Sequence, residues 1–511
     1  MKDRLLPLTR RDMIKLLATL PLGLAAGRFL PYRGESLVSR ETSYSNILIL
    51  VLDALSASHM SLYGYPRETT PNIDSFAKRC LVYHRHYATG NFTTPGTASF
   101  LTGTYPWLHR GLHLNGTILR NYATRSIFSL LPTSYYRLVY THNSLVSLLL
   151  AQFFQNIDRL LPFEKFGLLD DTFARRWSPD KYKIAYWSEH LVRGFDQIPS
   201  SLFGGIFESN RTSTLEKRLN EYQASFPRGI PYTNGQRWYF ILEDVVDWLI
   251  NNLSNLAFPF LGYFHLFPPH EPYHPRREFI DRFDDGWQIA TKPEHYFTHH
   301  VPKDDLIKHR RYYDEYLAYA DAEFGRLIKG LEKSGVLDNT ILILTSDHGQ
   351  LFERGIHGHM TPVMYEPLVH IPLLIACPGQ KQREDVHSLT SAADLMPSLL
   401  HYLGEPIPTS CEGQLLPGLG GRGFSDRCVF ALDAKESSKW GLLEKGTAAV
   451  WQGHYKMIHY FGYNGYDNID ELYKLDDDSD ELKNIARANP DLVSELKAAL
   501  REKLSRANAW E

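Results

Sequence analysis

A chain of 511 residues, 43% hydrophobic and 22% charged, has the composition of an ordinary globular protein and can bury a large core. Its net charge of −3 lacks the basic footprint of a nucleic-acid-binding protein, which excludes that class of partner. Four cysteines do not form a disulfide framework in a chain this long, and without a Cys-x-x-Cys motif a zinc ribbon is not expected.

Residues 1–27 are typical of an export signal. Arg10 and Arg11 precede a short apolar run over 16–26, which resembles a twin-arginine signal; an ordinary secretory signal and an uncleaved anchor are the alternatives. The run is too short for a confident transmembrane helix. We expect export to the periplasm or the extracellular space, with contact to the membrane surface if the signal stays uncleaved. A polar linker over 28–45 follows.

The first predicted strand is the apolar run over 46–52, which leads to the carboxylate of Asp53. A strand that is apolar without interruption suits a parallel sheet covered on both faces by helices. Ligands of such sheets bind beyond the carboxyl ends of the strands, so Asp53 is a candidate ligand residue. After it we expect a helix over 71–79 and a strand over 81–88.

A further helix is predicted to begin after Thr93. Thr94 before Pro95 is typical of an N-cap followed by proline at the first helical position, and Gly103 predicts the end of the helix. Thr93 then lies just outside the helix N-terminus, where free N–H groups and the helix dipole favour an anion. Its hydroxyl is a candidate nucleophile; a capped helix without a catalytic role is the alternative.

The middle of the chain predicts helices and one strand. An apolar run over 145–154 is interpreted as a buried helix and not as a membrane span. Helical spacing of apolar residues over 238–252 predicts a second helix, and 258–267 predicts a strand. A long polar-rich helix is expected over 305–334, with Gly335 as its stop.

The apolar run over 340–345 leads to Asp347 and His348 and predicts another strand of the parallel sheet. The carboxyl ends of parallel strands meet at one edge, so Asp53, Asp347 and His348 are expected to converge there. Two carboxylates, an imidazole and the hydroxyl of Thr93 form a ligand set suited to a divalent metal ion.

Glycine-interrupted histidines follow this strand and suit a flexible loop at the mouth of the site. His359 is a candidate for binding the transferred group or for protonating the leaving oxygen, and His357 is a second candidate. The alternative is that both are exposed loop histidines without a role in the site.

The part of the chain from about residue 406 onward predicts a smaller C-terminal region. Residues 450–451 and 455–458 are interpreted as edge strands, and 491–506 as a closing amphipathic helix. Cys411 and Cys428 lie in this region. They either form a disulfide in an exported protein or remain buried thiols.

The order of several motifs resembles the sulfatase family of the alkaline phosphatase superfamily. The resemblance covers roughly residues 45–125 and 240–490, and it is weak over 126–240. It implies an α/β catalytic domain at 46–405, with a mostly parallel sheet covered by helices on both faces, and a small α+β subdomain at 406–511. The divergent region over 126–240 is expected to shape substrate choice. The motifs are Asp53, Tyr63-Gly64-Tyr65-Pro66, Thr70-Pro71-Asn72-Ile73-Asp74, Leu101-Thr102-Gly103-Thr104-Tyr105-Pro106, Pro269-His270-Glu271-Pro272-Tyr273, Ser346-Asp347-His348-Gly349, Ile371-Pro372-Leu373-Leu374-Ile375, Asp394-Leu395-Met396-Pro397-Ser398-Leu399-Leu400, and Glu471-Leu472-Tyr473-Lys474-Leu475 with Glu481 and Asn484.

The site residues depart from the usual pattern of this family. Sulfatases of the usual kind carry cysteine or serine at position 93 and oxidise it to formylglycine, whereas Thr93 cannot become an aldehyde by that route. Thr97 replaces an expected arginine, and Ala54 replaces a second aspartate. Pro268 stands where relatives often carry aspartate, which removes a ligand that a second metal ion could use.

These departures imply a single divalent metal ion. Zinc or manganese is favoured because a histidine supplies nitrogen, and calcium or magnesium remains an alternative. The arrangement resembles the single-metal, threonine-dependent members that make phosphoglycerol or phosphoethanolamine polymers, namely lipoteichoic acid synthase-like and phosphoethanolamine transferase-like proteins. The resemblance also implies that His270, in a proline-rich turn, contacts the substrate. The expected metal ligands are Asp53, Thr93, Asp347 and His348.

The expected function is hydrolysis or transfer of a phosphate ester, with a phosphodiester favoured, carried by a small molecule, a lipid or a glycan. A phospho-threonine at Thr93 can be hydrolysed by attack at phosphorus, whereas a sulfo-threonine lacks the hemiacetal collapse that formylglycine provides. A sulfuric ester hydrolase is the alternative enzyme. A binding protein that kept the fold without turnover is the alternative from another class.

Overall fold

The structure is a computed structural model, and the residues that it describes all belong to one compact unit over 41–511. The predicted export signal over 1–27 lies outside the described residues, and so does nearly all of the predicted linker over 28–45. Among the described residues, no helix combines the length and the apolar character that crossing a membrane requires. The described residues are 44–169, 213–233, 238–423 and 426–508.

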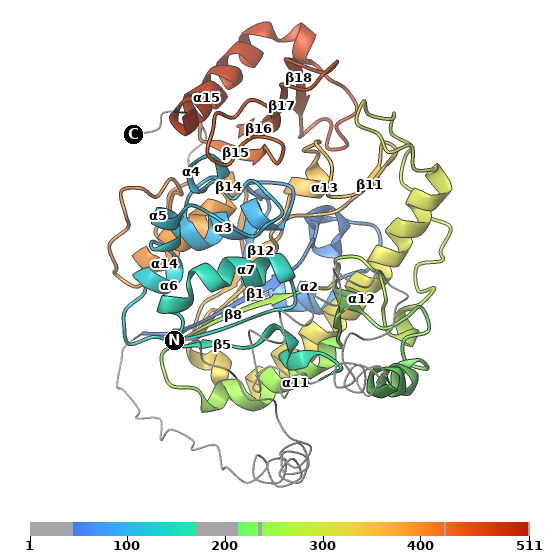
Figure 1. Ribbon diagram of the computed structural model, residues 1–511, viewed down its shortest axis with the longest axis vertical. Coiled ribbons are helices and arrows are strands. Elements are labelled where there is room, and N and C mark those ends of the chain that lie inside the picture. Colours follow the sequence, from blue (N-terminus) through green and yellow to red (C-terminus); the bar gives the residue numbers. More distant parts are fainter. Residues whose placement is uncertain (1–43, 170–212, 234–237, 424–425, 509–511) are drawn as a thin grey trace, which may run out of the picture. The chain divides into compact units, whose positions relative to one another are not determined.

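An eight-stranded sheet lies at the centre of this unit (Figure 1). In spatial order its strands are β13 (Glu384–Val386), β2 (Leu81–Tyr83), β12 (Leu373–Ala376), β9 (Thr340–Thr345), β1 (Asn46–Leu52), β8 (Phe260–Leu266), β4 (Tyr136–Thr141) and β5 (Arg159–Leu160). Every strand runs parallel to β1 except β12, which confirms the predicted mostly parallel α/β sheet. The two apolar runs, β1 and β9, are direct neighbours, so their carboxyl ends lie at the same edge.

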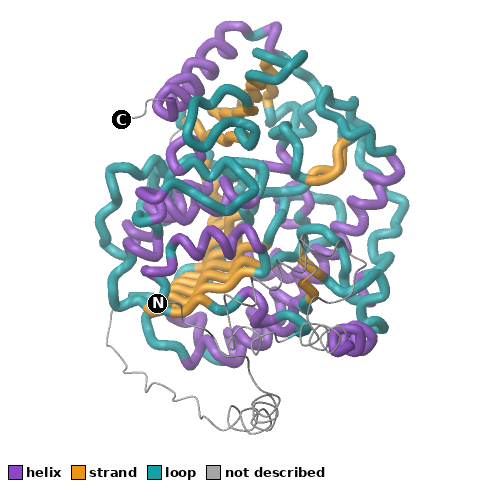
Figure 2. Tube along the Cα trace, viewed as in Figure 1, coloured by secondary structure: helices purple, strands orange, loops and turns teal. Residues whose placement is uncertain are grey.

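Helices cover both faces of the sheet (Figure 2). Alternate side chains of a central strand point to opposite faces, so an apolar strand needs packing partners on both faces. Leu48 and Leu50 of β1 belong to one core, which also contains side chains of α2 (Pro71–Ala77), α11 (Leu242–Asn252) and α12 (Lys303–Lys333). Ile47 and Ile49 belong to the other core, with side chains of α3 (Thr93–Thr102), α6 (Ile127–Leu130), α7 (Ser144–Gln152) and α14 (Leu395–Tyr402). Further short helices include α4 (Pro106–His109), α5 (Arg120–Ala123) and α13 (Glu366–Val369).

Two predicted elements are interrupted by short strands that pair outside the main sheet. The strand expected over 81–88 is β2 followed by β3 (His86–Tyr87), because β3 leaves the main sheet and pairs with β14 (Thr390–Ser391). The helix expected over 238–252 begins only at Leu242, because β7 (Trp238–Tyr239) pairs with β6 (Tyr232–Thr233). A further small hairpin, β10 (Leu351–Glu353) and β11 (Ile356–Gly358), follows β9.

The helix expected over 145–154 is α7, and it is only partly buried. Val146, Leu149 and Leu150 point into the core, whereas Leu148 is 53% exposed and Phe154, beyond the helix, is 65% exposed. The run is therefore an amphipathic helix with one apolar face on the sheet.

The C-terminal region contains its own antiparallel sheet, as predicted. Its order is β15 (Cys428–Asp433), β16 (Gly446–Gln452), β17 (Tyr455–Phe461) and β18 (Ile469–Lys474), and the closing helix is α15 (Pro490–Asn508). The interpretation of 450–451 and 455–458 as edge strands is wrong, because β15 and β18 pair on their outer sides. Cys411 and Cys428 are free thiols.

Candidate active site

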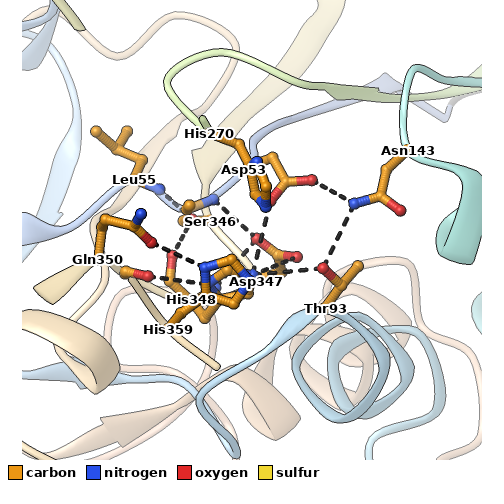
Figure 3. A network of polar contacts seen from close by, with 12 residues as sticks. Asp53, Leu55, Thr93, Asn143, His270, Ser346, Asp347, His348, Gln350 and His359 are labelled. Atoms are coloured by element: carbon orange, nitrogen blue, oxygen red, sulfur yellow. Dashed lines mark hydrogen bonds and ion pairs between the residues drawn. The ribbon is translucent and has the colours of Figure 1, made fainter. Parts of the chain in front are cut away.

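Two aspartates stand at the carboxyl ends of neighbouring strands, where the sequence pattern predicts them (Figure 3). Asp53 follows β1, Asp347 follows β9, and both are fully buried. The backbone N–H groups of Ala54 and His348 donate to Asp347 Oδ1 at 3.3 and 3.1 Å. Asp53 Oδ1 and Asp347 Oδ2 are buried without a hydrogen-bond partner among the described residues. Leaving two carboxylate oxygens in this state is costly unless a cation joins them.

His348 turns one ring nitrogen toward these two oxygens. Its Nδ1–H donates to the carbonyl of Gly349 at 2.9 Å, which leaves the lone pair of Nε2 available. Nε2 lies 3.6 Å from Asp53 Oδ1, 3.6 Å from Asp347 Oδ2 and 3.4 Å from Thr93 Oγ1. Ligand atoms around a tetrahedral ion with bonds of about 2.0–2.2 Å are about 3.3–3.6 Å apart. The three distances from Nε2 are compatible with one small divalent ion, and Asp53, Thr93, Asp347 and His348 as its ligands stay a prediction.

Thr93 is the first residue of α3 and not the residue before the helix. The helix begins earlier than predicted because Phe92, in extended conformation, is the N-cap, whereas Thr94 is already helical and makes no capping bond. Gly103 ends the helix as predicted, with a φ of 65°. The shift of two residues keeps the Thr93 hydroxyl at the helix N-terminus, where it faces His348.

The first turn of α3 approaches the backbone after β9 so closely that it requires glycine. A Cβ on Gly96 would lie 2.0 Å from the backbone oxygen of Asp347. We expect Gly96→Ala to lower the free energy of unfolding by about 1–3 kcal/mol and to reduce turnover by moving Thr93 away from Asp347. Thermal unfolding and rate measurements test this, with Gly441→Ala as the milder control, because Gly441 has no positive φ and its Cβ would meet only the side chain of Ser438, at 3.1 Å. A Gly96→Ala protein with wild-type stability and rate would contradict this packing.

Asn143 is a site residue that the sequence analysis missed. Its Oδ1 accepts from the backbone N–H groups of Leu145 and Val146 at the start of α7, which fixes the orientation of the amide. Nδ2 is thereby turned toward Asp53 Oδ2 at 2.6 Å and Thr93 Oγ1 at 3.4 Å (Figure 3). An asparagine that follows a strand and caps the next helix was the available signal.

Substitution of Asn143 can separate its two roles. Asn143→Asp keeps the acceptor that caps α7, but it loses the donor to Asp53 and places a second carboxylate beside it. We expect helix stability close to wild type with turnover reduced at least about tenfold. Asn143→Ala should lose turnover and also about 1 kcal/mol of stability from the cap. If Asn143→Asp turned over at the wild-type rate, the side chain would be a helix cap and nothing more.

His265 of β8 is the second residue that the sequence analysis missed. Its Nε2 lies 3.1 Å from Asp53 Oδ2 and 3.7 Å from Asp347 Oδ2, and its Nδ1 lies 3.0 Å from the hydroxyl of Tyr263. Asp53, His265 and Asp347 are thus a buried trio of groups able to hold a metal ion. Because Nε2 is already within hydrogen-bond distance of Asp53, we interpret His265 as orienting that carboxylate. A histidine near the end of an apolar strand was the signal.

The buried carboxylates and imidazoles shift one another's pKa values. Burial raises the pKa of Asp53, but His270, His265 and His348 lower it more, so the net shift is downward. Burial lowers the pKa of His265, and the carboxylates of Asp347 and Asp53 more than reverse that shift. Asp53 is therefore ionised at neutral pH, as a metal ligand must be.

Two of the three predicted loop histidines lie at the site. The ring of His359 is 4.3 Å from that of His348 and 4.9 Å from that of His270, and both His270 and His359 are largely buried. His359 Nδ1 lies 2.8 Å from Gln350 Oε1, which assigns Nδ1 as the donor and leaves Nε2 as an acceptor. Burial, with His348 and His270, holds the pKa of His359 well below its usual value. The neutral ring is suited to contacting the substrate.

His357 lies farther from the aspartates than His359 does. Its Nε2 is 3.2 Å from the hydroxyl of Tyr273, which accepts from Gln350 Nε2 at 2.6 Å, and its ring stacks on His309. Gln350 in turn contacts His359. His357 is therefore connected to the site through two side chains and does not contact the aspartates.

Comparison with known proteins shows where this fold and these motifs occur. The family profile described as Sulfatase matches residues 45–405, and the profile described as N-sulphoglucosamine sulphohydrolase, C-terminal, matches residues 355–509. Arylsulfatase K of Bos taurus is 28% identical over 293 residues, 51% of this chain and 53% of the relative, so the chain spans about half the length of that protein. Choline-sulfatase of Rhizobium meliloti (strain 1021) is 24% identical over 479 residues, 88% of this chain and 83% of the relative.

Solved structures share the fold. The crystal structure of phosphonate monoester hydrolase of Agrobacterium radiobacter superposes with a TM-score of 0.62 at 18% identity, and the match covers 91% of this chain and 96% of that chain. At this level of identity the likeness shows the fold alone. It confirms the fold class that the motifs predicted.

Proposed function

This chain belongs to the sulfatase family, and we propose that it is an exported, metal-dependent hydrolase or phosphotransferase that cleaves an anionic ester with Thr93 as the nucleophile. The observation that carries this proposal is the position of Thr93 Oγ1, 3.4 Å from His348 Nε2, beside the two unpartnered aspartate oxygens. A hydroxyl at a helix N-terminus is also favourably placed to receive an anion.

A single metal ion is part of this proposal. Asp53, Thr93, Asp347 and His348 would hold it, with zinc or manganese favoured over calcium or magnesium by the nitrogen of His348. When bound, such an ion activates a hydroxyl and neutralises the charge of an anionic ester.

The protein's own residues supply the remaining steps. Asn143 Nδ2 donates toward Thr93 Oγ1, so the hydroxyl proton points away from Asn143. It passes to solvent water as the oxygen attacks, and the leaving oxygen takes up a proton from water in turn. Attack at phosphorus forms the Thr93 O–P bond and breaks the bond to the leaving oxygen, while His270 and His359 contact the transferred group. Water then attacks phosphorus and releases Thr93, or an acceptor alcohol does so in a transfer reaction.

A phosphate ester, with a phosphodiester favoured, suits threonine best, because a phospho-threonine can be hydrolysed by attack at phosphorus. The second candidate is a sulfuric ester, and it is favoured by the names of the relatives, arylsulfatase K and choline-sulfatase. The phosphonate monoester hydrolase with the same fold shows that this architecture also serves phosphorus chemistry in another protein.

A substrate screen tests the proposal directly. Purified protein loaded with zinc or manganese is assayed against chromogenic phosphodiester, phosphomonoester and sulfate-ester substrates of the same phenol. We expect the highest kcat/KM for the phosphodiester. The highest value for the sulfate ester would support the second candidate. No turnover together with no tightly bound metal would instead identify a binding protein that kept the fold.

Export by the twin-arginine route gives a separate prediction. Replacing Arg10 and Arg11 together by lysine should leave the protein in the cytoplasm, because such signals are read through the arginine pair. Cell fractionation measures this, with Arg28→Lys, beyond the apolar run, as the matched control. Undiminished export of the double-lysine protein would show that a different route is used.

A further inference from the structure

A cavity of about 490 Å³ shares its wall with the candidate active site. We call it the side pocket. The turn after β8 supplies residues to both: His270 faces the site, and Glu271 and Tyr273 line the cavity. The residues that carry the argument are Arg228, Tyr232, Glu271, Tyr273, Tyr312 and His357.

A chain of hydrogen bonds joins the side pocket to the site. His357 contacts the hydroxyl of Tyr273 at 3.2 Å, Tyr273 contacts Gln350 at 2.6 Å, and Gln350 contacts His359 at 2.8 Å. The ring of His359 lies against that of His348. The side pocket and the site thus lie on either side of Tyr273 and Gln350, and the turn that carries His270 and Glu271 borders both.

The side pocket carries an uncompensated negative charge. Arg228 is bound by Glu315 and by Asp281, so its positive charge is already neutralised. Among the described residues, the only ion pair of Glu271, whose side chain is 39% exposed, is with His357, at 3.5 Å. Burial lowers the pKa of His357 to about 4, so that ring is neutral at pH 7 and leaves the carboxylate unpaired.

Other titratable groups near the cavity do not change this balance. Burial also lowers the pKa values of His274 and His309, so neither ring contributes a positive charge at neutral pH. Lys308 and Asp305, which both act on His309, offset one another. A ligand that enters the side pocket therefore meets the negative charge of Glu271.

The aromatic walls favour a cation as well. Tyr232, Tyr273 and Tyr312 line the cavity, and the guanidinium carbon of Arg228 lies 3.8 Å from the ring centroid of Tyr312. One tyrosine face already holds a cation, and the faces of Tyr232 and Tyr273 offer the same attraction to a ligand.

We propose that the side pocket binds an alkylammonium group carried by the alcohol part of the ester, with Glu271 as the counter-charge and Tyr232 and Tyr273 as aromatic walls. The inference rests on the proposed function, because the alcohol part is defined by the ester that the site would cleave. The binding itself needs no turnover and can be measured alone.

A matched pair of alcohols tests the binding. Choline and 3,3-dimethyl-1-butanol have nearly the same shape, and only choline carries a positive charge. Isothermal titration calorimetry on the full chain loaded with zinc should give a dissociation constant about tenfold lower for choline. Equal affinities, or binding of D-glucose without binding of choline, would overturn the inference and identify a pocket for neutral or polyhydroxyl groups.

Variants assign the effect to the side pocket. Glu271→Gln should reduce the preference for choline to within about twofold, and Glu384→Gln, an exposed glutamate of β13, should leave it unchanged. Tyr232→Leu provides a second test that does not touch the turn of His270 and should also weaken choline binding. Undiminished preference in both pocket variants would contradict the assignment.

Kinetics then distinguish this inference from the proposed function. On phosphodiesters that join p-nitrophenol to choline or to 3,3-dimethyl-1-butanol, Glu271→Gln should raise KM for the charged ester alone and leave kcat nearly unchanged. Choline binding that depends on Glu271 in a protein without turnover would leave the side pocket standing and refute the proposed function. Turnover without any preference for the charged ester would support the proposed function and refute the inference about the side pocket.

Discussion

Thr93→Ala is expected to lower turnover on the best ester substrate by about a thousandfold to a millionfold, as the loss of a nucleophile typically does. The reason is the position of the hydroxyl, 3.4 Å from His348 Nε2 and 3.4 Å from Asn143 Nδ2. Steady-state kinetics measure the effect. Thermal unfolding should change little, because the substitution removes no large apolar contact.

Two variants serve as controls for this prediction. Thr93→Ser should keep part of the activity, because the hydroxyl remains and only a methyl group is lost. Thr94→Ala should be close to wild type, because the neighbouring hydroxyl is equally buried but has no hydrogen-bond partner among the described residues. Near-normal rates for Thr93→Ala would mean that water attacks directly and that no covalent step occurs.

Removal of a metal ligand is expected to have the second large effect. His348→Ala and Asp347→Ala should each lose the bound ion and with it nearly all turnover. His348→Ala removes the nitrogen ligand that faces both aspartates, and Asp347→Ala removes one of the two carboxylates. Elemental analysis of wild-type protein should find about one zinc or manganese ion per chain. Activity and metal content should fall together.

His357→Ala is the matched control for the metal prediction. Its ring contacts Tyr273 and His309 and neither aspartate, so this variant should keep its metal ion. Two tightly bound ions per chain, or calcium alone, would contradict the single site with a nitrogen ligand.

Much of the central sheet could be predicted from local sequence. The runs over 46–52 and 340–345 contain unbroken apolar stretches at 47–52 and 341–344, a pattern typical of strands that are buried on both faces. The strand order could not be predicted, because it depends on contacts between residues hundreds of positions apart. The errors at β3 and β7 have a related cause. Each is a two-residue strand whose existence depends on its partner strand, and not on its own composition.

The site residues likewise divide into those that local sequence predicts and those that it does not. Asp53, Asp347 and His348 end continuous apolar strands, so their convergence follows from the geometry of a parallel sheet. Asn143, the N-cap of α7 after β4, and His265 of β8 carry only weak local signals, and their approach to Asp53 depends on the order of the strands in the sheet. The N-cap was misplaced by two residues, because Thr94-Pro95 satisfies the capping rule locally, whereas the extended residue before the helix is Phe92.

The covalent step at Thr93 can be observed directly by mass spectrometry. Metal-loaded protein is mixed with a slowly turned-over phosphodiester, quenched in acid during turnover and digested. We expect a phosphoryl or phosphoester mass increment on the peptide that contains Thr93, absent from Thr93→Ala and present in Thr94→Ala. Turnover of the same substrate with an unmodified Thr93 peptide at every quench time would contradict the central claim that this threonine is the nucleophile.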